Sequence, residues 1–211
     1  MPVSVEHSFV FVHIPKTGGT SIQVALRGAA ITLGLVGMST PDQREKLGIT
    51  DAWLHHIPAI ELRHILGTAA WDRFFKFAFV RNPWERLVSL YHFQRDQFAA
   101  SPDFRQRWPE IAARFATTHS FGEWLRGGPG PTLQLDRIAD REGRLLVDFV
   151  GRFEQIERDF SYVQQRIGIM ASLPHLLRSE HRPYRDYYDD EAHDLVAHHY
   201  RRDIEGFGYD F

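Results

Sequence analysis

The sequence contains no cysteine, and this absence excludes disulfide bonds and thiolate metal sites from the 211 residues. No apolar run approaches the roughly 20 residues of a membrane-spanning helix. The net charge of −2 is too small to attract nucleic acid over the whole surface, so any anion site must be local. Because the N-terminal segment also lacks a cationic leader, we expect a soluble cytoplasmic protein with no nucleic-acid partner and no membrane span.

Lysine is also scarce. Of the 25 basic residues, three are lysines, at positions 16, 46 and 76, and the other 22 are arginines. One of the three, Lys16, lies in a glycine-rich turn, which indicates a need for a compact ammonium group at that point. Apolar residues make up 43% of the chain, enough for a sizeable core. We therefore expect a single globular domain over residues 1–211.

Apolar segments rich in Val, Phe and Ile predict three buried strands, at residues 8–14, 75–81 and 145–151. Amphipathic segments with helix caps and breakers predict helices between and after these strands. The predicted helices cover 21–30, 58–66, 83–98, 154–168 and 189–207, with two or three further stretches between 103 and 127. Strands that alternate with helices predict an α/β fold with a central, mainly parallel sheet flanked by helices.

The stretch "IPKTGGTS", residues 14–21, joins the first strand to the first helix and is typical of a phosphate or sulfate site. The glycines allow close backbone approach, and the free amides at a helix N-terminus favour an anion. The candidate ligands of that anion are Lys16, Thr17, Gly18, Gly19, Thr20 and Ser21. The alternative is a plain strand-to-helix turn. The stretch is not a Walker A loop, in which the lysine follows the glycines.

The stretch "FKFAFVRNPWERLVSLY", residues 75–91, is the second informative segment. Arg81 ends a predicted strand, and Ser89 lies about two turns into the helix that follows. Ligands of α/β sheets gather beyond the carboxyl ends of the strands, so Arg81 is expected beside the Lys16 turn if the two strands are neighbours. Arg81 and Ser89 could together hold a second phosphate. The alternative is an arginine paired with Glu85 and a small serine packed on the sheet.

Together, "HIPKTGGTS" and "FVRNPWERLVSLY" resemble motifs of the sulfotransferases that use 3′-phosphoadenylyl sulfate (PAPS), in the branch of carbohydrate (heparan-type) and bacterial enzymes. The first is similar to that family's 5′-phosphosulfate loop. The second is similar to its 3′-phosphate motif, in which an Arg and a Ser eight residues apart, here Arg81 and Ser89, hold the 3′-phosphate. The segments "VDFVGRFEQIERDF" and "YYDDEAHDLVAHHYRRDIEGFGYDF" also resemble bacterial members. The resemblance implies a P-loop-like three-layer fold.

The resemblance further implies transfer of a sulfonate group from PAPS to an acceptor hydroxyl, with adenosine 3′,5′-bisphosphate as product and no metal. Lys16 would stabilise the leaving 5′-phosphate. The expected acceptor is an oligo- or polysaccharide, whose identity and sulfated position the sequence leaves open, as it does the oligomeric state. Residues 97–140 match no family motif, and we expect acceptor specificity to reside there. The alternatives are a non-catalytic nucleotide-binding module of the same fold and a small-molecule kinase.

The acceptor hydroxyl needs a general base, and histidine is suited to that role. In related carbohydrate sulfotransferases, a His between the two motifs does this work. His56 directly precedes the predicted helix at 58–66 and is the favoured candidate, with His55 or another group as alternatives.

Two further segments carry charged and aromatic side chains. Arg152 and Glu154 follow the third predicted strand, and we interpret them as a structural ion pair. Arg182, Tyr184 or Arg185 could contact the nucleotide, since a loop of the family closes over it near this place. An exposed basic and aromatic turn is the alternative.

Overall fold

The computed structural model of the chain describes residues 3–26, 56–117, 120–127, 130–174 and 181–211. They form two compact units, each with its own hydrophobic core. Unit 1 comprises Met1–Arg81 and Gln134–Leu177, and unit 2 comprises Asn82–Leu133 and Arg178–Phe211. The single domain expected over residues 1–211 stays a prediction.

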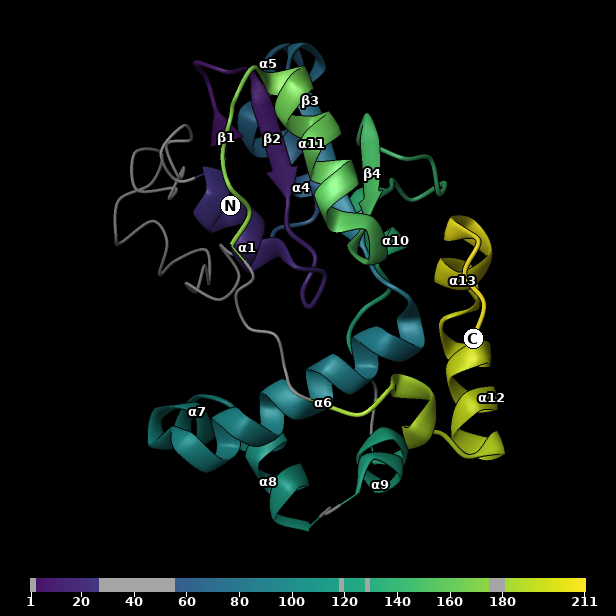
Figure 1. Cartoon of the computed structure of the whole chain (residues 1–211). Coiled ribbons are helices and arrows are strands. Elements are labelled where there is room, and N and C mark those ends of the chain that lie inside the picture. The colour runs from purple at the N-terminus through teal and green to yellow at the C-terminus, as the bar shows by residue number, and fades with distance from the viewer. Residues whose placement is uncertain (1–2, 27–55, 118–119, 128–129, 175–180) are drawn as a thin grey trace. The chain divides into compact units, whose positions relative to one another are not determined.

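Unit 1 is built on a four-stranded sheet in the order β1-β2-β3-β4 (Figure 1). The strands are β1 (Val3–Ser4), β2 (Phe9–Val12), β3 (Phe75–Val80) and β4 (Phe149–Arg152). β1 runs antiparallel to β2, whereas β2, β3 and β4 are parallel. The mainly parallel sheet predicted from the sequence is therefore confirmed.

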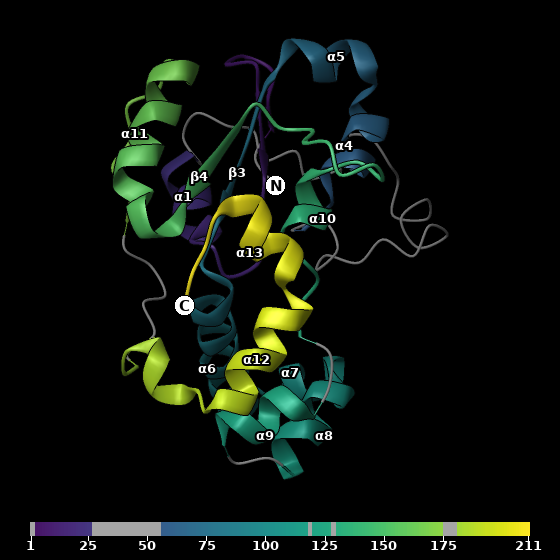
Figure 2. The same ribbon diagram turned by 90° about the vertical axis from the view of Figure 1, so that its right-hand side faces the viewer.

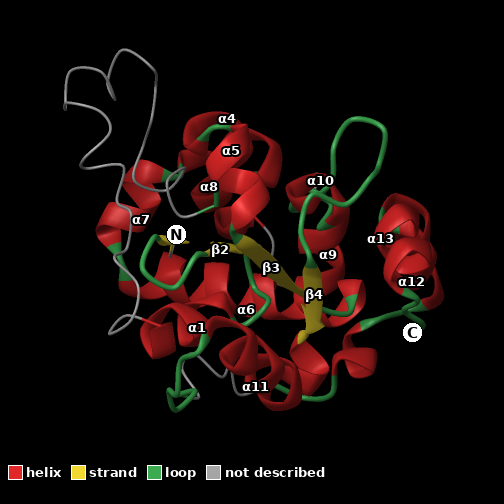
Figure 3. Ribbon diagram, turned by 90° about the horizontal axis from the view of Figure 1, so that it is seen from above, coloured by secondary structure: helices red, strands yellow, loops and turns green. Residues whose placement is uncertain are grey.

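Helices cover both faces of this sheet (Figure 3). One face carries α1 (Gly19–Leu26) and α11 (Ile156–Ile167), and the other carries α4 (Ala59–Leu66), α5 (Thr68–Arg73) and α10 (Leu135–Ile138). Alternate strand residues point to the same face, and the phenylalanines at 9, 11, 77 and 79 form one buried cluster with apolar residues of α1 and α11. This arrangement confirms the predicted three-layer α/β fold.

The third strand starts later than predicted. It covers Phe149–Arg152, not 145–151, because the Asp148 side chain replaces a backbone carbonyl as the acceptor opposite β3. The Asp148 carboxylate accepts the backbone N–H of Lys76 at 2.8 Å and pairs with the Lys76 ammonium at 2.9 Å. Leu145 instead forms an antiparallel bridge with Ala139. The apolar run is thus divided between a bridge and a strand, separated by an acidic residue. The short helix η2 (Phe153–Gln155) follows β4 directly.

Unit 2 is helical and centres on α6 (Pro83–Ala100), the long helix predicted to start at Pro83 (Figure 2). The Asn82 side chain caps α6 by accepting the backbone N–H groups of Trp84 and Glu85. Apolar residues of α6 form one core with those of the other described helices of this unit, with the exception of α7. These helices are α7 (Pro102–Arg107), α8 (Pro109–Thr117), α9 (Phe121–Arg126), η3 (Tyr184–Tyr187), α12 (Asp190–His199) and α13 (Arg201–Phe207).

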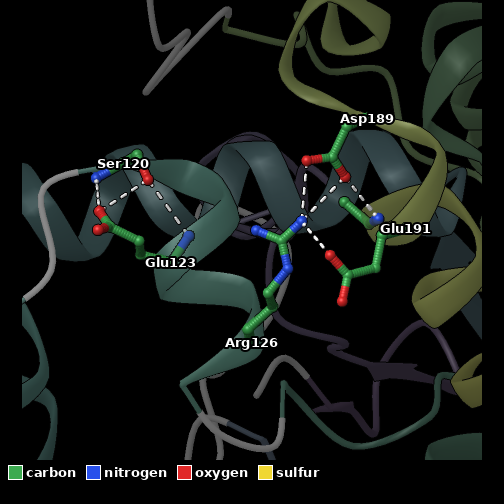
Figure 4. A network of polar contacts seen from close by, with 6 residues as sticks. Ser120, Glu123, Arg126, Asp189 and Glu191 are labelled. Atoms are coloured by element: carbon green, nitrogen blue, oxygen red, sulfur yellow. Dashed lines mark hydrogen bonds and ion pairs between the residues drawn. The ribbon is translucent and has the colours of Figure 1, made fainter.

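The helix predicted over 189–207 is divided into α12 and α13 at Tyr200, whose buried hydroxyl donates to the Pro131 carbonyl at 2.9 Å. At the start of α12, Arg126 of α9 contacts Asp189 at 2.8 Å and Glu191 at 3.0 Å (Figure 4). These ion pairs connect α9 to α12 at the surface of unit 2, where such pairs contribute little to stability. None of the helices described is long and apolar enough to cross a membrane.

Candidate active site

The candidate site of unit 1 lies where the three parallel strands end. The register pairs Val12 of β2 with Ala78 of β3, and Val80 of β3 with Arg152 of β4, so the carboxyl ends share one edge of the sheet. The Lys16 turn follows β2, Arg81 follows β3, and η2 follows β4. The segments that carry the predicted site residues of unit 1 therefore leave the sheet at a common edge, as the sequence predicted.

The backbone of the Lys16 turn is held in an unusual conformation. Lys16 has φ = 68°, in the left-handed region that side-chain-bearing residues rarely adopt, and it is partly exposed. Such a conformation costs on the order of 1–3 kcal/mol and concentrates at functional sites. The Thr17 hydroxyl, fully buried, donates to the Ile14 carbonyl at 2.9 Å and closes the turn. The Thr17 side chain therefore holds the turn together, and its role toward a ligand stays a prediction.

The two glycines of the turn permit close packing against other parts of unit 1. A Cβ atom on Gly18, whose φ is 80°, would lie 2.6 Å from Cδ1 of Ile156, and one on Gly19 would lie 2.0 Å from the His13 ring. Gly19 is also the first residue of α1, so this helix starts slightly earlier than the predicted caps, Thr20 and Ser21. Thr20 is exposed and Ser21 is buried at this N-terminus, where backbone amides favour an anion.

Arg81 lies against the Lys16 turn, which confirms the predicted proximity. Its side chain is 6% exposed, and Nη1 donates to the Lys16 carbonyl at 3.4 Å. The guanidinium also lies over the Phe153 ring of η2, 4.0 Å from the centroid, in a cation–π contact. Arg81 thus connects the turn after β2 with the helix after β4.

His56 lies beside His13, the residue between β2 and the turn. The ring centroids of the two histidines are 4.5 Å apart, and Nδ1 of His56 is 3.3 Å from the His13 carbonyl oxygen. A carbonyl only accepts hydrogen bonds, so Nδ1 carries the hydrogen in this contact, and Nε2 is then the basic nitrogen of the neutral ring. The His13 ring is held as well, because its Nδ1 lies 3.2 Å from the side-chain amide nitrogen of Gln23.

Two polar residues of a single segment hold Arg81 and His56 in place. The fully buried Gln134 accepts the Arg81 backbone N–H at 2.9 Å and donates to the Arg81 carbonyl at 2.8 Å. One turn further, Arg137 of α10 donates to the His56 carbonyl at 2.6 Å. The segment Gln134–Arg137 therefore braces the backbones of two predicted site residues. No pattern in the sequence assigns a role to either residue, and the polar pair in "TLQLDRIAD" is the available signal.

The remaining predicted residues lie elsewhere. Ser89 is buried on α6 of unit 2, and its joint action with Arg81 stays a prediction. His55, the alternative base, lies outside the described residues. In unit 2, Arg185 donates to the Phe211 carbonyl at 2.5 Å and lies over the Tyr184 ring, and Arg182 lies over the Tyr187 ring. These contacts give the basic and aromatic segment a structural role, and its predicted role toward the nucleotide stays open.

Comparison with known proteins identifies the family. The sequence profile of the sulfotransferase family matches residues 1–210, almost the whole chain. The chain belongs to the sulfotransferase family.

Several curated proteins are similar to this chain. Carbohydrate sulfotransferase 14 of Danio rerio is 25% identical over 186 residues, covering 79% of this chain and 47% of that protein. Carbohydrate sulfotransferase 11 of Mus musculus is 24% identical over 198 residues, covering 81% and 53%. An uncharacterized protein of Archaeoglobus fulgidus is 27% identical over 118 residues, covering 56% and 87%. The chain thus spans about half the length of the carbohydrate sulfotransferases that it matches.

A solved structure shares the fold. The crystal structure of mouse sulfotransferase SULT7A1 complexed with PAP aligns with a TM-score of 0.54 at 12% identity, covering 95% of this chain and 86% of that one. At this identity the likeness establishes the fold alone. Within the described ranges, no group of three or more His, Asp or Glu side chains is placed to hold a metal ion.

Proposed function

We propose that this chain transfers a sulfonate group from PAPS to a hydroxyl group of a carbohydrate acceptor. One observation carries the proposal: the Lys16 turn, Arg81 and His56 lie together at the carboxyl edge of one sheet. They are linked by the contact of Arg81 with the Lys16 carbonyl at 3.4 Å and that of His56 with the His13 carbonyl at 3.3 Å. The first contact unites the two predicted nucleotide motifs, and the second brings the predicted base to the start of the same turn.

The groups at this edge have the chemistry that the nucleotide requires. An ammonium, a guanidinium, three hydroxyls and the amides of a helix N-terminus can all donate hydrogen bonds, and the first two carry a positive charge. Lys16, Thr17, Gly18, Gly19, Thr20 and Ser21 would hold the 5′-phosphosulfate. Arg81 would hold the 3′-phosphate, joined by Ser89 on the strength of the motif spacing. When bound, PAPS supplies the sulfonate on its 5′-phosphate.

The residues of the chain have different roles in the transfer. Nε2 of His56 takes the proton from the acceptor hydroxyl as its oxygen forms the new bond to sulfur. The bond between sulfur and the 5′-phosphate oxygen breaks, and Lys16 stabilises the negative charge left on that oxygen. Arg137 and His13 orient His56 from its two sides, through the His56 carbonyl and through Nδ1. We propose no metal in this step.

Titration of the protein with adenosine 3′,5′-bisphosphate by calorimetry tests the proposal. We expect saturable binding without Mg²⁺ and stabilisation against unfolding by about 2.7 kcal/mol at a hundred times the Kd. Arg81→Ala should weaken binding about 10- to 100-fold, because it removes a charge-assisted hydrogen bond donor. Arg73→Ala is the matched control, since this exposed arginine ends α5, just before the end of β3 that lies opposite Arg81.

Other outcomes favour the alternatives. Absence of bisphosphate binding would refute the assignment, and Mg²⁺-dependent turnover of ATP would favour a kinase. Tight bisphosphate binding with no transfer to any hydroxyl acceptor would favour a non-catalytic module of the same fold.

A further inference from the structure

Unit 1 contains a second feature that the nucleotide does not account for, a groove beside α4. It is bounded by α4, the start of α5, α10 and the turn that follows α10, and its volume is about 820 Å³. Ligand-binding pockets typically measure roughly 300–1,000 Å³. We call it the α4–α10 groove. It has room for a ligand of several ring units.

This groove adjoins the element that positions the predicted base. α4 begins three residues after His56, and α10 contains Arg137, which donates to the His56 carbonyl at 2.6 Å. Burial lowers the pKa of Arg137, and the nearby carboxylates of Glu61 and Asp136 act in the opposite direction. Glu61 and Asp136 both line the groove. The groove wall and the support of His56 are therefore parts of the same structure.

The lining of the groove carries charges of both signs. Besides Asp140, it contains two carboxylates, Glu61 and Asp136, and two guanidinium groups, Arg63 and Arg141. The groove also contains Asp140, but its carboxylate is engaged by Arg144 at 2.8 Å and by the backbone N–H groups of residues 142 and 144. Because the two arginines of the lining are outnumbered by its three carboxylates, the wall has no excess of positive charge and offers a polyanion no net attraction.

The groove also combines polar groups with an apolar surface. The Ile60 side chain is 42% exposed, although it is large and apolar. Carboxylates accept hydrogen bonds from hydroxyl groups, and guanidinium groups donate hydrogen bonds to hydroxyl oxygens. An exposed aliphatic side chain can cover the C–H face of a sugar ring. A neutral ligand rich in hydroxyl groups matches all three.

We propose that the α4–α10 groove binds an uncharged oligosaccharide, the part of the acceptor that flanks the sulfated hydroxyl. This inference rests on the proposed function, because it assigns the groove to the acceptor of the same reaction. The unit next to the reacting hydroxyl would lie by His56, and the following units would lie along α4 between Glu61 and Arg141.

Direct binding tests the groove independently of transfer. The probes are neutral tetrasaccharides (maltotetraose, cellotetraose and chitotetraose) and the polyanionic tetragalacturonate, titrated into the whole chain and followed by NMR. We expect at least one neutral probe to bind, and the double variant Arg63→Ala/Arg141→Ala to weaken it about tenfold or more. Arg73→Ala, outside the groove lining, is the matched control and should change nothing. The double variant should keep the wild-type affinity for adenosine 3′,5′-bisphosphate, which shows that it is folded.

Kinetics give the second readout. With PAPS saturating, the double variant should lower kcat/KM for the neutral tetrasaccharide about tenfold and leave it unchanged for the corresponding monosaccharide. The inference is overturned if no neutral probe binds, if tetragalacturonate binds more tightly, or if the variant leaves tetrasaccharide binding intact. None of these results contradicts the proposed function as long as the bisphosphate binds and sulfonate is transferred. If the wild type neither binds the bisphosphate nor transfers sulfonate, the proposed function is refuted instead.

Discussion

Replacement of Gln134 by alanine is predicted to destabilise the protein strongly. The Gln134 side chain is 0% exposed and satisfies both backbone groups of Arg81, through hydrogen bonds of 2.9 and 2.8 Å. Gln134→Ala leaves a buried N–H and a buried carbonyl without these partners, and each such group costs about 1–3 kcal/mol. The two together give a loss of about 2–6 kcal/mol, a large share of the roughly 5–15 kcal/mol that stabilises a typical protein.

Urea unfolding of the variant measures this loss. Gln165→Ala is the matched control, because Gln165 is exposed on α11, and its replacement should change the unfolding free energy by less than about 0.5 kcal/mol. Gln134→Glu adds a second comparison. An ionised carboxylate can accept the Arg81 N–H but repels the Arg81 carbonyl, so this variant should lose stability as the pH rises above about 4.3. If Gln134→Ala unfolds within 0.5 kcal/mol of the wild type, the bracing role of Gln134 is wrong.

Two further predictions concern packing and pH. Gly19→Ala should lower the melting temperature and cost about 1–3 kcal/mol, because its Cβ would lie 2.0 Å from the His13 ring, whereas Gly122→Ala meets only the flexible end of a side chain and should be tolerated. Burial chiefly lowers the pKa of His92 to about 4 from its ordinary 6.5, and Tyr187 fixes its ring at 2.9 Å. The unfolded chain therefore binds the proton first, and the stability associated with neutral His92 is lost as the pH falls from 6.5 toward 4. Urea unfolding at pH 7.0, 5.5 and 4.5 should show a smaller decline in His92→Gln, and an unchanged decline would contradict this origin.

Much of unit 1 was predictable because its strands carry a strong local signal. The phenylalanines of β2 and β3 alternate with residues that are apolar except for Lys76. Parallel order of the strands then places Lys16 and Arg81 at the same edge of the sheet. The start of β4 was misplaced because the Asp148 side chain replaces a backbone partner, which no apolar pattern reveals.

The supports of the site could not be read from the sequence. Gln134 contacts a backbone 53 residues away, and Arg137 contacts one 81 residues away. Contacts of this kind depend on how α10 folds back over the sheet, whereas periodicity reports only on near neighbours. The division of the last predicted helix at Tyr200 has the same origin, since the Tyr200 hydroxyl bonds to Pro131, 69 residues earlier.

The central claim is that this fold transfers sulfonate at the Lys16 turn. The most direct measurement follows labelled sulfonate from PAPS to a hydroxyl acceptor, with the wild type and with Lys16→Ala. We predict transfer by the wild type, a loss of about 100- to 1,000-fold in turnover for the variant, and a much smaller change in its affinity for the bisphosphate. A Lys16→Ala variant that transfers sulfonate at the wild-type rate would contradict the account.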